Sequence, residues 1–184
     1  ATTPAWAGRA QVGTGAGTWS DWGLDQASAT GQGWRDGLLV QDDTKTGDPS
    51  SVAVQVFDAA HAARAEASAQ ALLRQPDGLP GLAFSGRRAV ESDRDAGRLS
   101  LLSETTRAAY TTAGGSTRQG YVSGYSFAEL FETFDVFYAR DRAGPVQVTL
   151  TLTLDGRIDG RSGGNGWIDG VQVYAALGGV DTGV

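Results

Sequence analysis

The sequence predicts an all-β fold, an antiparallel β-sandwich or jelly roll with glycine-rich turns. The first observation is a strict alternation of apolar and polar residues, clearest over Val146–Leu154, which is the period of a half-buried strand. The second is that 27 glycines are spread over 184 residues without a repeat, which suits many turns and excludes a collagen helix. The third is that no segment carries a convincing helical period. Together they favour a sandwich over folds that alternate helices and strands.

Short strands separated by polar turns are expected in the first third of the chain. Leu38–Val40 is predicted to be a short buried strand. The polar segment Asp42–Ser51 is predicted to be a turn because it contains Gly47 and Pro49. The next segment, Ser51–Asp58, alternates, so its valines share one face of a strand.

The alanine-rich segment Ala63–Leu72 needs a choice between helix and strand. Its alanine content favours a helix. Its pattern favours a strand, because every second residue is alanine and most of the residues between are polar. A period of two places those polar residues on one face of a strand but scatters them around a helix. We therefore predict that this segment is extended.

The rest of the chain is predicted to form a further series of strands. Charged or glycine-containing turns separate them, among them Thr111–Gly120. In the most aromatic strand the alternation slips between Glu129 and Glu132, which predicts a bulge or a bend. The strands are expected at residues 82–90, 98–103, 120–139, 146–154 and 166–180.

The N-terminal residues are expected to stand apart from the sandwich. Residues 1–17 are predicted to form an extended arm and residues 18–184 a single β-sandwich domain, because the first stretch is glycine-rich and offers few apolar side chains. We expect the arm to add as a strand to the sheet edge of a neighbouring subunit, with Trp6 and Val12 as assembly residues. The alternative is that it packs on its own domain as an edge strand.

Charge and composition limit the classes of partner and compartment. The formal net charge of -6 disfavours a duplex nucleic acid, whose phosphates require a basic face. No apolar run reaches the roughly 18 residues that a membrane-spanning helix needs. The chain begins ATTPAWAGRA without a methionine, so we expect a secretory signal peptide to have been removed. The absence of cysteine leaves the redox compartment open.

Candidate catalytic groups are few, and the sequence predicts that the protein is not an enzyme. His61 is the single histidine, so a Ser-His-Asp triad could use only this residue, and no G-x-S-x-G motif occurs. One histidine without cysteine cannot supply the usual ligands of zinc. No catalytic residue and no cofactor are therefore expected.

Three carboxylates offer a glycosidase as a weaker alternative. Glu129, Glu132 and Asp135 lie close together in the sequence, and glycoside hydrolysis requires a pair of such groups. On a strand, Glu129 and Glu132 point to opposite faces unless a bulge intervenes. We therefore expect these acids on a solvent-exposed face beside a phenylalanine-rich core.

The glycine-rich segment 155–170 contains oxygen donors of the kind that bind calcium. Its hard oxygen donors are Asp155, Asp159, Asn165 and Asp169. Their spacing matches neither an EF-hand loop nor a nonapeptide repeat. Asp-Gly and Asn-Gly pairs are also what hairpin turns require. We predict turns here, with calcium binding as the alternative.

Exposed tryptophans can form sugar-stacking platforms, whereas buried ones belong to a core or a subunit contact. The sequence does not separate these two roles. The candidates for glycan stacking are Trp19, Trp22, Trp34 and Trp167.

Three segments, in this order, resemble secreted PEP-CTERM-type proteins of exopolysaccharide-producing bacteria. They are AARAEASAQALL, YSFAELFETFDVF and VTLTLTLDGRIDG, and the resemblance covers roughly Val52–Gly160. The Pro-Glu-Pro motif, apolar segment and basic tail of such proteins do not occur in this sequence, so either sorting has removed them or the protein is of another type. The resemblance implies a non-enzymatic, extracellular matrix or surface role and brings no catalytic residues.

The function expected from the sequence is therefore structural. The chain is predicted to be a secreted bacterial subunit that self-assembles into a filament, sheath or biofilm matrix, as a homo-oligomer or polymer joined by the N-terminal arm. The alternative is an extracellular carbohydrate-binding sandwich associated with exopolysaccharide, with polysaccharide as its partner.

Overall fold

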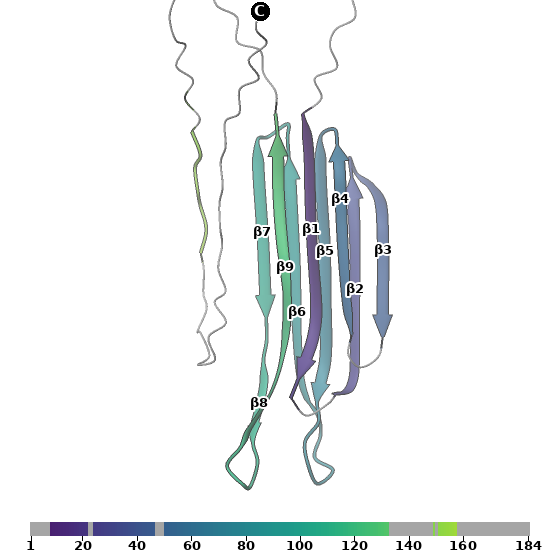
Figure 1. Cartoon of the computed structure of the whole chain (residues 1–184), viewed down its shortest axis with the longest axis vertical. Coiled ribbons are helices and arrows are strands. Elements are labelled where there is room, and N and C mark those ends of the chain that lie inside the picture. The colour runs from purple at the N-terminus through teal and green to yellow at the C-terminus, as the bar shows by residue number, and fades with distance from the viewer. Residues whose placement is uncertain (1–7, 22–23, 47–49, 133–148, 150, 158–184) are drawn as a thin grey trace, which may run out of the picture. The chain divides into compact units, whose positions relative to one another are not determined.

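The computed structural model describes residues 8–21, 24–46, 50–132, 149 and 151–157 (Figure 1). The chain divides into two compact units, residues 1–137 and 138–184. Every strand formed by the described residues belongs to the first unit, and none of the described residues is helical. The predicted all-β sandwich is confirmed.

Two antiparallel sheets form the sandwich. One sheet has four strands in the order β4-β1-β9-β8, and the other has five in the order β3-β2-β5-β6-β7. The seven strand pairings among the described residues are all antiparallel. The strands are β1 (Arg9–Ser20), β2 (Leu24–Arg35), β3 (Leu38–Thr46), β4 (Ser51–Ala59), β5 (Ala62–Leu73), β6 (Leu82–Asp93), β7 (Arg98–Thr105), β8 (Ala108–Thr111) and β9 (Thr117–Phe131).

The core between the sheets follows from the alternation in the sequence. The segment Ala63–Leu72 is extended within β5 as predicted, and its alanines are buried while most of the residues between them are not. The valines of β4 face it from the other sheet. The largest fully buried side chain is Phe84 of β6, which fits because its partner across the core is Gly120. A Cβ on Gly120 would lie 2.5 Å from Phe84 Cε1. Small residues in one sheet therefore make room for large ones in the other.

The Asp36 carboxylate connects two turns by hydrogen bonds at one end of the sandwich. Asp36 and Gly37 have φ angles of 49° and 82°, the left-handed pair that a two-residue hairpin between β2 and β3 requires. The Asp36 carboxylate accepts hydrogen bonds from the backbone N–H groups of His61 at 2.8 Å, Ala62 at 3.0 Å and Ala60 at 3.3 Å. These donors, that of Ala62 foremost, lower the pKa of Asp36 below its ordinary value. The ionised carboxylate thus fixes the β4–β5 turn against the β2–β3 turn.

The predicted N-terminal arm is wrong for its described residues. Residues 9–17 belong to β1, which lies inside the four-stranded sheet and pairs with β4 on one side and with β9 on the other. Val12 is fully buried in the core of its own chain and is not an assembly residue. Trp6 lies outside the described residues. The alternative of an edge strand is also wrong, because β1 has a partner on each side. The chain divides after residue 137, so residues 18–184 are not one compact unit.

Other expectations also differ from the structure, among them the turn predicted over Asp42–Ser51, whose described residues up to Thr46 belong to β3. Leu38–Val40 does begin a strand, but its side chains are exposed because β3 is an edge strand of the five-stranded sheet. No bulge interrupts β9, whose pairing with β1 runs without a register shift to Phe131. Among the described residues of the predicted strand Val146–Leu154 none is in a strand, and Leu152 and Leu154 are exposed. The strand expected at residues 166–180 lies outside the described residues.

The core assignment predicts different effects for two phenylalanines. Replacing Phe84 by alanine removes a ring that is 1% exposed, so we expect it to lower the free energy of unfolding by about 3–5 kcal/mol. Phe57 points away from the core and is 46% exposed, so Phe57→Ala should change it by less than about 0.5 kcal/mol. Urea denaturation followed by circular dichroism measures both. Equal losses in the two variants would contradict the assignment.

Candidate functional site

The outer face of the four-stranded sheet is built from two complementary strands. In β1 the residues that face away from the core include Gly13, Gly15 and Gly17, whereas the residues between them are buried in the core. In β9 every aromatic residue lies at an odd-numbered position and faces the same outer side. They are Tyr121, Tyr125, Phe127 and Phe131. A row of rings on one strand therefore lies beside a row of glycines on the next.

The register places these rings directly over the glycines. Gly13 pairs with Phe127 and Gly15 pairs with Tyr125. A Cβ on Gly13 would lie 2.3 Å from Phe127 Cε1, and one on Gly15 would lie 3.0 Å from Tyr125 Cε1. Both glycines are buried although they point outward, because the rings cover them. Glycine within a strand commonly marks such a close approach, and here it lets rings lie against the sheet.

Further aromatic contacts extend the row at both ends. Trp19 follows the glycines on β1 and packs against Tyr121, with ring centroids 5.0 Å apart and an angle of 36° between the planes. At the other end the Arg9 guanidinium lies 4.6 Å from the centroid of the Phe131 ring, a cation–π contact. Trp19 is 47% exposed, Tyr125 45% and Phe131 42%. We call these five side chains the aromatic strip: Trp19, Tyr121, Tyr125, Phe127 and Phe131.

Polar side chains border the aromatic strip. Gln55 of β4 donates a hydrogen bond from Nε2 to the Tyr125 hydroxyl at 3.3 Å. Gln11 of β1 donates one to the Glu129 carboxylate. Rings with an apolar face and hydrogen-bonding groups at their margins therefore share one exposed surface.

The carboxylates that could have formed a glycosidase site have other partners. Arg94 Nε donates a hydrogen bond to Glu132 Oε2 at 2.7 Å, and its Nη2 donates one to Oε1 at 3.2 Å. The hydrogen bond from Arg94 lowers the pKa of Glu132, and the same bond raises the pKa of Arg94. A general acid for glycoside cleavage needs a raised pKa instead. Asp135 lies outside the described residues.

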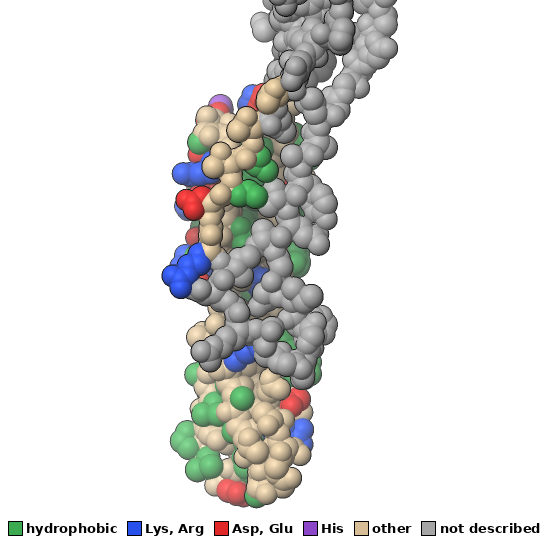
Figure 2. Space-filling view, turned by 90° about the vertical axis from the view of Figure 1, so that its left-hand side faces the viewer, with side chains coloured by type: hydrophobic (Ala, Val, Ile, Leu, Met, Phe, Trp, Pro, Cys, Tyr) green, Lys and Arg blue, Asp and Glu red, His purple; other side chains and the backbone are tan. Residues whose placement is uncertain are grey.

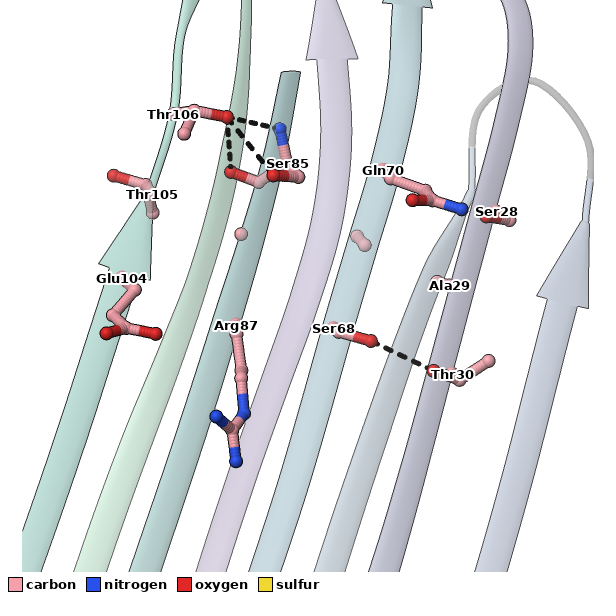
Figure 3. A pocket seen from close by; sticks show the side chains of 12 residues that line it. Ser28, Ala29, Thr30, Ser68, Gln70, Ser85, Arg87, Glu104, Thr105 and Thr106 are labelled. Carbon is pink, nitrogen blue, oxygen red and sulfur yellow. Dashed lines mark hydrogen bonds between the residues drawn. The ribbon is translucent and has the colours of Figure 1, made fainter. Parts of the chain in front are cut away.

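The outer face of the five-stranded sheet carries a shallow polar depression of about 540 Å³ (Figure 3). The strand register lines up Thr30, Ser68, Arg87 and Glu104 across four strands, with Ser28, Gln70 and Ser85 in the row beside them. Neighbouring hydroxyls bond to each other, Thr30 to Ser68 at 2.9 Å and Ser85 to Thr106 at 3.1 Å. This face has polar groups but no aromatic residue among those lining the depression.

The remaining candidates bring no reactive group together. The His61 ring Nδ1 lies 2.9 Å from Asp95 Oδ2 on an exposed turn. In the part of the chain that the structure describes, no group of three or more His, Cys, Asp or Glu side chains could hold a metal ion. Of the calcium candidates, Asp155 is exposed, and Asp159, Asn165 and Asp169 lie outside the described residues.

The two tryptophan candidates that the structure describes lie on different sheets. Trp19 lies in the aromatic strip, whereas Trp34 lies on the other sheet with the Arg64 guanidinium 4.4 Å from its ring centroid. Trp22 and Trp167 lie outside the described residues. The tyrosines and phenylalanines of β9 were not predicted as site residues, although their shared odd-numbered positions in the sequence place them on one face of a strand.

Comparison of the chain with family models, with curated proteins and with solved structures finds no match. None of the described residues forms a helix long and apolar enough to cross a membrane.

The contact of the Phe127 ring with Gly13 predicts that the two residues are energetically coupled. Gly13→Ala places a methyl group where the Phe127 ring lies, so it should lower the free energy of unfolding by about 1–3 kcal/mol. Gly114→Ala is the matched control, since its Cβ would meet no atom closer than 3.9 Å, and it should cost less than about 0.5 kcal/mol.

The double variant Gly13→Ala/Phe127→Ala identifies the cause of that loss. Removing the ring relieves the clash, so the double variant should be more stable than the sum of the single losses predicts. Urea denaturation of the four proteins provides the cycle. Additive losses would show that Phe127 does not rest on Gly13.

Proposed function

We propose that this chain is a non-enzymatic, extracellular polysaccharide-binding module, and that it binds through the aromatic strip. The observation that carries the proposal is the row of exposed rings lying against glycines on the four-stranded sheet. Large apolar side chains on a flat exposed face need a partner, because contiguous apolar patches mark interaction sites.

The chemistry of the aromatic strip suits a sugar. One face of a pyranose ring presents mainly C–H groups and packs on an aromatic ring, while its hydroxyls point sideways and need hydrogen-bonding partners. Trp19, Tyr125 and Phe131 supply the exposed rings, and the Tyr125 hydroxyl and Gln55 supply polar atoms next to them. Because the rings are held by glycines and the β1–β9 pairing, little side-chain freedom is lost on binding.

The shape of the face favours a polymer over a small ligand. The aromatic strip follows β9 from Tyr121 to Phe131, which spans about 33 Å at roughly 3.3 Å per residue. Sites for small ligands are concave and bury most of the ligand. An open row of separated rings instead offers successive contacts to an extended chain of sugar units.

The absence of catalysis and the extracellular location are parts of the same proposal. Glu132 has a lowered pKa and is held by Arg94, so it is poorly suited to donate a proton. The resemblance to secreted proteins of exopolysaccharide-producing bacteria supports an extracellular site of action. A polysaccharide outside the cell is then the partner that the aromatic strip would meet.

A structural subunit of a fibre, sheath or matrix is the second candidate, and a different observation favours it. Both edge strands of the five-stranded sheet, β3 and β7, expose leucines. Exposed apolar edge strands are surfaces for pairing with another chain. Assembly through residues 9–17 is excluded by their place in the sheet, so a subunit contact would have to use another edge.

The proposal predicts that binding depends on one sheet and not on the other. Trp19→Ala and Tyr125→Ala should each weaken polysaccharide binding by about three- to tenfold, since each removes one stacking contact. Trp34→Ala, on the opposite sheet, is the matched control and should leave the affinity unchanged. Affinity electrophoresis and titration calorimetry against neutral and acidic polysaccharides measure this.

Two results would contradict the proposal. One is that the protein binds no member of the polysaccharide panel. The other is that Trp34→Ala abolishes binding while Trp19→Ala and Tyr125→Ala have no effect, which would move the site to the five-stranded sheet.

A further inference from the structure

An irregularity in β4 lies on the same face as the aromatic strip. The register between β1 and β4 shifts between Ala10 and Val12, so that two residues of β4 lie opposite one residue of β1. The two are Phe57 and Asp58, the one is Gln11, and such an arrangement is a β-bulge. The residues before and after the pair are buried in the core, whereas Phe57 and Asp58 are both exposed. The bulge thus places two consecutive side chains outside the core, which strict alternation does not allow.

The bulge requires an unusual backbone conformation at Asp58, whose φ angle is 53°. Two other described residues besides glycine have a positive φ, Asp36 and Asp77, and each is followed by a glycine in a turn between strands. Asp58 instead lies within a strand. Strained backbone of this kind persists only where the surrounding structure holds it, and it is frequent at binding sites. The bulge is therefore a candidate functional feature.

Contacts connect the bulge to one end of the aromatic strip. Arg9 Nη1 lies 3.2 Å from Asp58 Oδ1, and the same guanidinium lies 4.6 Å from the centroid of the Phe131 ring. One row of side chains therefore crosses three strands, from Asp58 on β4 through Arg9 on β1 to Phe131 on β9. The bulge thus helps to hold the end of the strip in place.

A second row lies beside the first and crosses the same three strands. In the bulge, Phe57 lies opposite Gln11, and Gln11 pairs with Glu129 of β9. Gln11 Nε2 donates a hydrogen bond to the Glu129 carboxylate. On β9, Glu129 lies between Phe127 and Phe131, which share its face. An amide and a carboxylate therefore lie between an aromatic ring on β4 and the rings of β9.

Exposure by itself would not single out Phe57. The side chain is 46% exposed, but Figure 2 shows other hydrophobic side chains exposed along one side of the sandwich. Its position distinguishes it, because the bulge holds it on the face that carries the aromatic strip. Phe57 adds a ring on the opposite side of β1 from the rings of β9.

We propose that Phe57 is a further polysaccharide-binding residue and belongs to a subsite for one uncharged sugar unit at the end of the aromatic strip. The members of this bulge subsite are Gln11, Phe57, Glu129 and Phe131. The inference rests on the proposed function. The rings pack on the C–H groups of the sugar, while the amide and the carboxylate offer hydrogen-bonding atoms to its hydroxyls.

The charges at the bulge subsite disfavour an acidic sugar. The Glu129 carboxylate is bonded to the neutral amide of Gln11, so this contact does not balance its charge. The cation at this end, Arg9, is already paired with Asp58. A uronate would therefore bring a further negative charge next to Glu129, and like charges placed together in an interface are unfavourable. The formal net charge of -6 also opposes the approach of a polyanion.

The first test measures the affinity for neutral polysaccharides by titration calorimetry. Phe57→Ala should weaken binding by about three- to tenfold, since it removes one stacking contact, and Phe57→Tyr should bind like the parent because it keeps the ring. Leu102→Ala is the matched control, because it removes a side chain that is 41% exposed on the outer face of the five-stranded sheet. It should leave the affinity unchanged.

The outcomes of this test separate the inference from the proposed function. If Trp19→Ala weakens binding and Phe57→Ala does not, the bulge only shapes β4 and the inference is wrong, while the proposed function stands. A parent protein that binds no polysaccharide would overturn both.

The second test measures the selection against acidic sugars. It uses the neutral polysaccharide that the parent binds and the same polymer after oxidation of its primary hydroxyls to carboxylates. The parent should bind the oxidised polymer at least about tenfold more weakly, and Glu129→Gln should reduce this difference. Glu104→Gln, on the outer face of the five-stranded sheet, is the matched control and should not change it. Equal affinity of the parent for both polymers, or the same difference in Glu129→Gln as in the parent, would overturn the assignment of an uncharged sugar.

Discussion

The outer side of β1 determines what the rest of the four-stranded sheet can present. Its inward residues are packed in the core, whereas Gly13, Gly15 and Gly17 face outward and have no side chain. Without rings from β9 these glycines would leave bare backbone and a weakened strand. With them, the strand is covered and the rings are fixed in place. Stability of the central strand and exposure of an aromatic surface are thus two results of one contact.

The two sheets divide the surface of the sandwich into parts with different chemistry. The four-stranded sheet exposes rings, and the five-stranded sheet exposes hydroxyl, amide and charged groups whose hydrogen bonds are partly made to each other. Among the described residues, β8 pairs with β9 only at Thr117–Gly120, and β7 exposes Leu99 and Leu101. In the proposed function, a polysaccharide binds the first of these surfaces.

Much of the fold could be predicted from the sequence, and the candidate site could not. Period-two alternation is a local property, so it identified Ala63–Leu72 as a strand against its alanine propensity. The glycines of β1 were interpreted locally as well, as a segment with little to bury, because their partners lie more than 100 residues later in the chain. Only the register between β1 and β9 shows that Gly13 lies under Phe127. The same limit explains why Leu38–Val40 was predicted to be buried although it is exposed. Whether an apolar strand is central or at an edge depends on the order of strands in the sheet and not on the strand itself.

The most direct test of this account is the proton NMR spectrum of the assigned protein at Gly13 and Gly15. Protons in close contact with an aromatic ring experience its ring current, so the α-protons of both glycines should resonate well away from ordinary glycine values. Phe127→Leu should return the Gly13 signals, and Tyr125→Leu the Gly15 signals, to the ordinary range while the other glycine keeps its shift. Ordinary α-proton shifts for both glycines in the parent protein would contradict the account, because the rings would then not lie over β1.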